Sequence, residues 1–415
     1  MGPAKSKVEV ADWAIQLDTW PRKLIAIALV FLTCGILIYR NWWLFAVAWI
    51  TRSNKTDDPA IYERAIRYDP KNANYHFVLG QIYNYSTQFL NIPRAGEEYE
   101  AAVRLNPYRA NHWLELSKYY EQQKNIDGAR NAMKMGLERD PNYAQSHWAA
   151  ANLYIRLNDL KSADLELRRT ADLDVSYLTQ VLDLVWQFYE DPDRIASTHI
   201  PNTHDANLTA LRYFISVKSE RGAELMWQGL RTFAPKLPER FSYIDYLVSI
   251  NKVSEAWNVF LYPASESESL IFNASFESEP LNGGFDWRFA STDRAQGRRD
   301  TTTARSGFAS WLVTFDGKEN LDYSGLAHWI PVTKGKKYNL SFWMKTEAIS
   351  TNEGMFVEVD GQASEKQVGT TYWKQFTIPF TAVSDLVTVR LRRVPSKKFD
   401  NLLKGKVWLD DFEIN

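Results

Sequence analysis

The sequence predicts a multidomain α + β protein with one N-terminal transmembrane helix, an all-α solenoid of repeats and a C-terminal all-β sandwich. Three observations predict this class. One apolar segment near the N-terminus has the length of a membrane span, a four-fold recurrence follows at nearly constant spacing, and beyond about residue 270 the pattern changes to short alternating runs. A chain of 415 residues is also long enough for several domains.

The apolar segment begins at Leu24 and continues to Tyr39, interrupted by one Thr and one Gly. Continued through Trp43 it reaches about 30 Å at about 1.5 Å per residue, which is the thickness of the hydrocarbon core. We therefore expect residues 24–50 to form a transmembrane helix that runs on into the first repeat. A signal peptide cleaved after Ala46-Val47-Ala48 is the rival interpretation, and the length of the segment and its two Trp residues disfavour it.

The charges that flank this segment favour a cytoplasmic N-terminus by a small margin. Lys5, Lys7, Arg22 and Lys23 precede it, whereas Arg40, Arg52 and Lys55 follow it. We expect a single-pass protein of a bacterial inner membrane, with residues 1–23 in the cytoplasm and the C-terminal domains in the periplasm. Tryptophan is common at membrane interfaces and in protein contacts, so the residues expected to contact the bilayer or a partner are Trp13, Trp20, Trp42, Trp43 and Trp49.

The recurrence occupies residues 42–175. Counted from Trp113, it places Leu116, Ser117, Tyr120, Ala129, Met133 and Pro141 at offsets that resemble the tetratricopeptide (TPR) repeat. Similar series start at Trp42, His76 and His147. In such repeats the small residues lie where two helices cross and the aromatic residues fill the space between successive repeats. The resemblance therefore implies a TPR solenoid whose first helix is fused to the membrane helix.

Helical patterns persist over residues 176–262, although the repeat consensus decays. We interpret this part as divergent TPR-like helices that cap the solenoid. Residues 263–270, rich in Ser and Glu, form the predicted linker to the next domain.

Short alternating runs follow over residues 271–415 and predict a β-sandwich: Ser310–Thr314, Tyr338–Met344, Met355–Val359, Phe376–Phe380, Leu386–Leu391 and Val407–Ile414. The opening Asn273-Ala-Ser-Phe276-Glu277 and the closing Val407-Trp-Leu-Asp410-Asp411-Phe-Glu-Ile414 resemble jelly-roll carbohydrate-binding modules of the family 4, 9 and 22 type. This jelly-roll resemblance extends over about the last 145 residues.

The resemblance to these modules implies two kinds of site. In such modules the two ends of the domain meet and often hold a structural calcium, so Glu277 and Asp411 are candidate ligands, and two solvated or hydrogen-bonded carboxylates are the alternative. Exposed aromatic residues stack on sugars, and the candidates for this role are Trp287, Tyr323 and Trp329. Trp343, Trp373 and Trp408 match buried consensus positions instead.

Composition excludes several classes of protein. The net charge is −1, with 49 basic and 50 acidic residues, which argues against a nucleic-acid partner. Cys34 is the single cysteine, so an intramolecular disulfide or a thiolate metal cluster cannot form. The sequence has no nucleotide-binding loop, zinc motif or nucleophile elbow, and we predict no catalytic residue and no cofactor other than calcium.

These observations predict a non-enzymatic, membrane-anchored scaffold. It would serve as a structural or assembly accessory subunit of a larger membrane protein complex, for example a photosynthetic or respiratory energy-converting assembly, and its partners would be other protein subunits. The alternative is a carbohydrate-binding envelope protein in polysaccharide export or cell-wall attachment. Fold alone does not choose between them.

Overall fold

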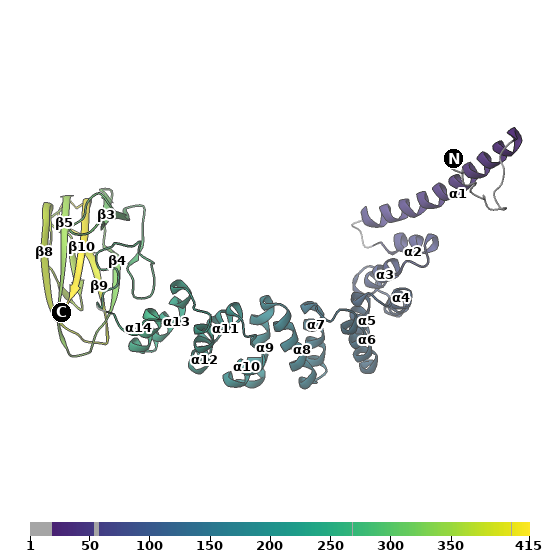
Figure 1. Cartoon of the computed structure of the whole chain (residues 1–415), viewed down its shortest axis with the longest axis horizontal. Helices are drawn as coiled ribbons and strands as arrows, with labels where there is room; N and C mark the ends of the chain where they lie inside the picture. Colours follow the sequence, from purple (N-terminus) through teal and green to yellow (C-terminus); the bar gives the residue numbers. More distant parts are fainter. Residues whose placement is uncertain (1–18, 54–57, 268, 400) are drawn as a thin grey trace, which may run out of the picture. The chain divides into compact units, whose positions relative to one another are not determined.

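A computed structural model describes residues 19–53, 58–267, 269–399 and 401–415. The chain divides into two compact units, residues 1–174 and 175–415 (Figure 1). The first unit contains helices α1 (Trp20–Ser53), α2 (Pro59–Tyr68), α3 (Ala73–Tyr85), α4 (Ile92–Leu105), α5 (Ala110–Gln122), α6 (Ile126–Arg139), α7 (Ala144–Arg156) and α8 (Leu160–Leu173).

The second unit begins with helices and ends with strands. Its helices are a short 3-10 turn (Val175–Tyr177), α9 (Leu178–Tyr189), α10 (Pro192–Thr198), α11 (His204–Ser216), α12 (Glu220–Arg231), α13 (Leu237–Ser249) and α14 (Val253–Leu261). Its strands are β1 (Arg288–Phe289), β2 (Ala295–Asp300), β3 (Ser310–Asp316), β4 (Tyr323–Pro331), β5 (Lys337–Ile349), β6 (Phe356–Val359), β7 (Gln362–Ala363), β8 (Gly369–Thr381), β9 (Leu386–Arg393) and β10 (Lys404–Ile414). A multidomain α + β architecture is therefore confirmed.

Helix α1 is continuous from Trp20 to Ser53, and residues 20–51 are long and apolar enough to span a membrane. Helix α2 packs on its C-terminal half, where Val47 is buried against Ala65 and Tyr75. The Trp43 ring stacks on Tyr68 with centroids 5.4 Å apart. The apolar helix and the first repeat thus share one packed crossing.

The recurring small positions lie where the two helices of each repeat cross. Ala95, Ala129 and Ala163 are at most 1% exposed, and a Cβ on Gly80 would lie 2.9 Å from the Tyr99 ring. Larger side chains at these positions would force the helices apart.

The recurring aromatic position ties each repeat to the turn before it. A ring nitrogen of His76 lies 3.3 Å from the Pro70 carbonyl oxygen, and one of His147 lies 3.0 Å from that of Pro141. Trp113 donates from Nε1 to the Pro107 carbonyl oxygen at 2.9 Å. The same position thus satisfies a carbonyl group of the preceding turn in three successive repeats.

The strands form two five-stranded antiparallel sheets, with orders β1-β4-β9-β6-β7 and β2-β3-β10-β5-β8. Apolar side chains of both sheets form the core between them, for example Phe342, Val357 and Val407. The chain ends of this domain meet, because the Phe412 N–H donates to the Ala274 carbonyl oxygen at 3.1 Å. A two-sheet sandwich is therefore confirmed.

The sandwich packs on the last helix of its own unit. Trp257 and Phe260 of α14 contact Phe285 with ring centroids 5.1 and 5.7 Å apart, and Phe260 also contacts Phe272. An ion pair of 3.1 Å joins Arg288 to Asp245 of α13. The segment predicted to be a linker is thus bridged by aromatic packing between the elements on its two sides.

Candidate partner-binding surfaces

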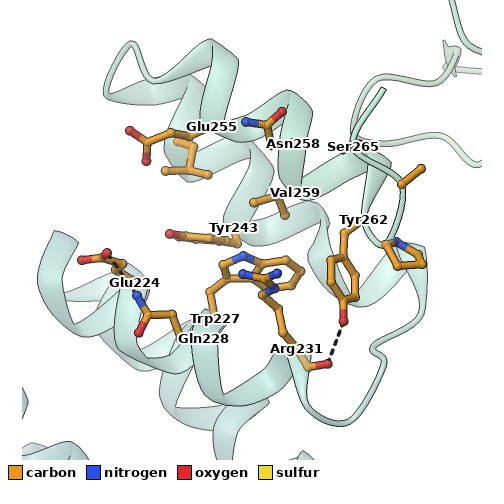
Figure 2. A pocket seen from close by; sticks show the side chains of 13 residues that line it. Glu224, Trp227, Gln228, Arg231, Tyr243, Glu255, Asn258, Val259, Tyr262 and Ser265 are labelled. Atoms are coloured by element: carbon orange, nitrogen blue, oxygen red, sulfur yellow. Dashed lines mark hydrogen bonds between the residues drawn. The ribbon is translucent and has the colours of Figure 1, made fainter. Parts of the chain in front are cut away.

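A hollow of about 540 Å³ lies between α12 and α14 (Figure 2). Each helix contributes residues spaced by three and four positions, which places them on one face. From α12 these are Glu224, Trp227, Gln228 and Arg231, and from α14 and the residue after it they are Glu255, Asn258, Val259 and Tyr262. We call this hollow the α12–α14 pocket.

Aromatic rings form the centre of the α12–α14 pocket. The Trp227 ring lies 5.8 Å from the rings of both Tyr243 and Tyr262, and the Arg231 guanidinium lies 5.0 Å from the centre of the Tyr262 ring. The Tyr262 hydroxyl donates to the Arg231 carbonyl oxygen at 3.0 Å (Figure 2). Rigid amphipathic rings of this kind contribute much of the binding energy at protein interfaces.

The charged rim of the α12–α14 pocket is largely paired. Glu224 forms an ion pair of 3.0 Å with Arg221, and Glu255 forms one of 3.0 Å with Lys252. Burial, followed by the charges of these two carboxylates, raises the pKa of Tyr243 to about 12, so its hydroxyl remains a proton donor. Trp227 and Tyr243 are only 8% and 4% exposed, so they form the floor of the pocket. The groups open to a bound chain are the half-buried Tyr262 ring and the neutral side chains of Gln228 and Asn258.

The first unit carries a second hollow between α5 and α7, of about 200 Å³. Trp148 and Asn152 line it together with the ion pair of Arg156 and Glu121. That pair is bidentate, with Nε to Oε1 at 2.5 Å and Nη2 to Oε2 at 2.8 Å. The first helices of successive repeats thus present a polar groove with one large aromatic side chain.

Two of the residues expected to stack on sugars are buried in the sandwich core. Trp287 is 1% exposed and donates from Nε1 to the Asn273 carbonyl oxygen at 3.0 Å, and Tyr323 is 4% exposed. The expectation of accessible ring faces therefore does not hold for these two residues, because both belong to the inter-sheet core. Trp329 is half-buried, and the Arg288 guanidinium lies 3.7 Å from the centre of its ring.

The outer face of the β2-β3-β10-β5-β8 sheet carries the Trp residues that the sequence assigned to buried positions. Trp343 alternates with the core residues Phe342 and Met344, so its side chain points to the opposite face of the sheet. It is half-buried, and the Arg305 guanidinium lies 4.1 Å from its ring centre. Trp408 is buried as expected, but on this same outer face, 4.9 Å below the Lys345 ammonium group.

Glu277 and Asp411 both bind the loop that precedes β3. Glu277 Oε1 accepts hydrogen bonds from the N–H groups of Phe308 and Ala309 at 2.9 and 3.3 Å. Asp411 Oδ1 accepts one from the Ser306 hydroxyl at 2.6 Å. Within the described residues, no group of three His, Cys, Asp or Glu side chains could hold a metal ion, so calcium at these two carboxylates stays a prediction.

Asp410, which the sequence did not single out as a site residue, is fully buried beside them. Its Oδ2 accepts from the Arg305 N–H at 2.7 Å, and its Oδ1 accepts from the Asp411 N–H at 2.8 Å. Burial raises the pKa of Asp410 to about 6, and the neighbouring Asp411 charge adds to the increase, although the two hydrogen bonds lower the pKa. The Asp-Asp sequence itself was the only signal of this buried carboxyl group.

The Trp residues of the membrane segment differ in exposure. Trp20, Trp42 and Trp49 are 73%, 65% and 63% exposed, and Trp43 is 40% exposed where it stacks on Tyr68. Trp13 lies outside the described residues. Trp42 and Trp49 each contact Phe45, which places the three rings along one face of α1.

No protein-family model matches this chain, and no curated protein matches it. Among solved structures it is similar to MamA from MSR-1, with 22% identity, 31% of this chain and 73% of that chain covered, and a TM-score of 0.26. It is also similar to PilW, described as a widely conserved type IV pilus biogenesis factor, with 15% identity, 53% and 90% covered and a TM-score of 0.26. A third structure is TmCBM61 in complex with β-1,4-galactotriose, with 16% identity, 36% and 99% covered and a TM-score of 0.27.

These similarities are distant and concern fold alone. TPR proteins and carbohydrate-binding modules are both represented among the structures that this chain resembles.

Proposed function

We propose that this chain is a non-enzymatic scaffold that joins protein subunits into a larger membrane complex. Helix α1 anchors it in a bacterial inner membrane, with the N-terminus in the cytoplasm and the solenoid and sandwich in the periplasm. The observation that carries the proposal is the α12–α14 pocket, where two facing helical stripes enclose three aromatic rings in a charge-paired rim. A peptide segment of a partner subunit would bind there by contact with the Tyr262 ring and by hydrogen bonds to the neutral side chains of Gln228 and Asn258.

The test compares the proteins that co-purify from native membranes with the unaltered full-length chain and with its variants. Gln228→Arg and Asn258→Arg each place a long charged side chain on one wall of the pocket, and both positions are on the helix surface. We expect both variants to lose most of the companion subunits measured by quantitative mass spectrometry. Gln88→Arg, the matched control on an exposed loop, should retain them. Equal recovery from all three variants would refute this role of the pocket.

A second test addresses the membrane anchor. Residues 1–41 are exchanged for an unrelated signal anchor of matched length, which leaves the crossing of Val47 with Ala65 intact. If the anchor takes part in assembly, the exchange releases the chain from its complex without unfolding the solenoid. Unchanged co-purification would show that the water-exposed domains alone carry the assembly.

Carbohydrate binding is the second candidate function, and the outer sheet face with Trp343, Trp373 and Trp408 favours it. Trp343 and Trp373 are half-buried, so parts of both rings remain accessible. Saturable binding to envelope polysaccharides that is lost in Trp343→Ala and kept in the exposed control Phe399→Ala would establish this function over the scaffold. Absence of such binding in the unaltered chain would exclude carbohydrate binding as a function of this chain.

A further inference from the structure

Helix α2 runs back along the C-terminal end of α1, toward the apolar segment that begins at Leu24. Three contacts about one helical turn apart join the two helices: Tyr62 with Thr51, Ala65 with Val47, and Tyr68 with Trp43. Residue numbers rise along α2 as they fall along α1, so the two helices are antiparallel. The last turn of α2 therefore lies closest to the apolar segment.

In a chain anchored by α1, the hydrocarbon core of the bilayer ends near Trp43. Residues 24–43 reach about 30 Å in a helix at about 1.5 Å per residue, which is the thickness of that core. Beyond Trp43, α1 is accompanied by α2, whose Arg64 and Arg67 are exposed. Arginine is strongly disfavoured among lipid tails, so α2 lies outside the core. Tyr68 stacks on Trp43 and therefore marks the level at which the core ends.

The exposed face of α2 places positive charge at the level of the lipid headgroups. Arg64 and Arg67 are three positions apart, so they share one face of the helix. At about 1.5 Å per residue, Arg64 lies about 6 Å farther from the core than Tyr68. The headgroup layer on each side of a bilayer is roughly 5–8 Å thick. Both guanidinium groups are thus within reach of this layer.

The nearby acidic side chains do not neutralise these cations. Glu63, the one acidic residue of α2, forms an ion pair of 2.9 Å with Arg94 instead. Asp69, which follows α2, is half-buried and accepts a hydrogen bond from an asparagine amide. Within the described residues, neither Arg64 nor Arg67 forms an ion pair. Their charge is therefore available to an anionic surface.

Two turns between helices extend this positive surface. Lys71 is exposed in the turn after Tyr68, at the end of α2 that lies closest to the apolar segment. The turn between α4 and α5 lies beside it, because residues of both turns line one hollow. This second turn exposes Arg109 and Tyr108, which is 84% exposed. Cations beside aromatic residues are typical of membrane interfaces, whereas the next turn along the solenoid carries Asp140 instead.

On the basis of the membrane anchor proposed above, we propose that this surface lies on the bilayer and binds anionic phospholipid headgroups. We call it the basic edge, and it consists of Arg64, Arg67, Tyr68, Lys71, Tyr108 and Arg109. Basic residues next to a membrane span are attracted to anionic lipids, and each one adds to the attraction. The crossing with α1 and the basic edge together hold the first repeat in one orientation on the membrane.

The experiment measures fluorescence quenching of the full-length chain in vesicles of equal amounts of phosphatidylcholine and phosphatidylglycerol. Cys34 is the single cysteine, so Cys34→Ser combined with Lys71→Cys places one fluorophore on the basic edge. Cys34→Ser combined with Lys161→Cys places it on the exposed surface of α8, as the matched control. The quencher is a nitroxide near the top of the acyl chain, carried by either lipid.

We expect strong quenching at position 71 and little at position 161, with labelled phosphatidylglycerol quenching position 71 more than labelled phosphatidylcholine does. Arg64→Glu combined with Arg67→Glu should abolish this preference, since each cation near an anionic surface favours contact roughly fivefold. Arg64→Lys combined with Arg67→Lys keeps the charge and should keep the preference. Circular dichroism confirms that each variant is folded.

A fluorophore on the native Cys34 separates failure of the anchor from failure of the basic edge. If nitroxides deep in the acyl chains do not quench it, α1 does not span the bilayer, and the proposed anchor and the basic edge both fail. If Cys34 is quenched but positions 71 and 161 are quenched equally, the first repeat does not lie on the membrane. Equal quenching of position 71 by the two labelled lipids would likewise overturn the binding of anionic headgroups and leave the anchor intact.

Discussion

Phe285 connects the sandwich to the last helix of the solenoid, and its removal should uncouple them. The ring is fully buried and contacts Trp257 and Phe260 of α14 on one side and Trp329 of β4 on the other. A ring that buries roughly 150–250 Å² contributes about 4–6 kcal/mol at about 25 cal/mol per Å², which is an upper bound. Measured Phe→Ala series give about 3–5 kcal/mol, and we adopt that range.

The substitution Phe285→Ala is therefore expected to lower the melting temperature of the unit 175–415 by roughly 6–20 °C, at about 2–4 °C per kcal/mol. Hydrogen exchange read by mass spectrometry gives the location of the loss. We expect faster exchange in α14 and in the strands that contact it, because both lose the same packing partner.

Two control variants show whether the effect is specific to the contact between the sandwich and α14. Phe342→Ala removes an equally buried ring that stacks on Phe376 and Phe412 inside the sandwich, so exchange should increase in the strands and not in α14. Phe399→Ala removes a fully exposed ring and should change nothing. If Phe285→Ala matches Phe399→Ala, or if α14 keeps its protection, the packing argument is wrong.

The remaining predictions concern pH and calcium. Because the pKa of Asp410 is raised, this carboxyl group stabilises the folded state fully below about pH 4, and the stabilisation is lost as pH rises through about 6. The variant Asp410→Asn should therefore flatten the pH dependence of the free energy of urea unfolding of the sandwich between these values. An unchanged slope would contradict this prediction. The hydrogen bond with Glu98 raises the pKa of His76, so its contribution to the solenoid is complete below about pH 6.5 and is lost as pH rises through the folded pKa; His76→Gln should remove that part of the titration. If Glu277 and Asp411 hold calcium, chelation should lower the melting temperature of the sandwich and Asp411→Asn should abolish the effect, whereas an identical melting curve with and without chelator would exclude the ion.

Helical periodicity and repeat spacing predicted much of the helical part, because both are local properties of the sequence. The offsets from Trp113 and His147 correspond to the helix pairs α5–α6 and α7–α8, since a small residue at a crossing and an aromatic residue beside a turn are needed in every repeat. Alternation likewise predicted β3, β5, β6, β8, β9 and β10. Strands β1, β2, β4 and β7 were missed. Strands β1 and β7 have only two residues each, β2 is almost entirely polar, and Gly325, His328 and Pro331 weaken the apolar pattern of β4.

Which face of a strand is covered depends on distant parts of the chain, and the sequence pattern does not contain that information. Trp287 was expected to be accessible, but it is buried by Phe276 and Phe412 from the two ends of the domain. Trp343 was assigned to a buried position, but it lies on the outer face, since alternate residues of β5 already fill the core.

The sequence by itself determined the membrane-length helix, the order of the repeats and the two-sheet sandwich, because each follows from periodicity within short segments. Tertiary structure alone decided the sites. The α12–α14 pocket joins residues about 30 positions apart, and the sandwich packs on α14 through Phe285. Such sites depend on how whole helices and sheets pack together, whereas the local sequence pattern specifies only which positions are apolar and which are polar.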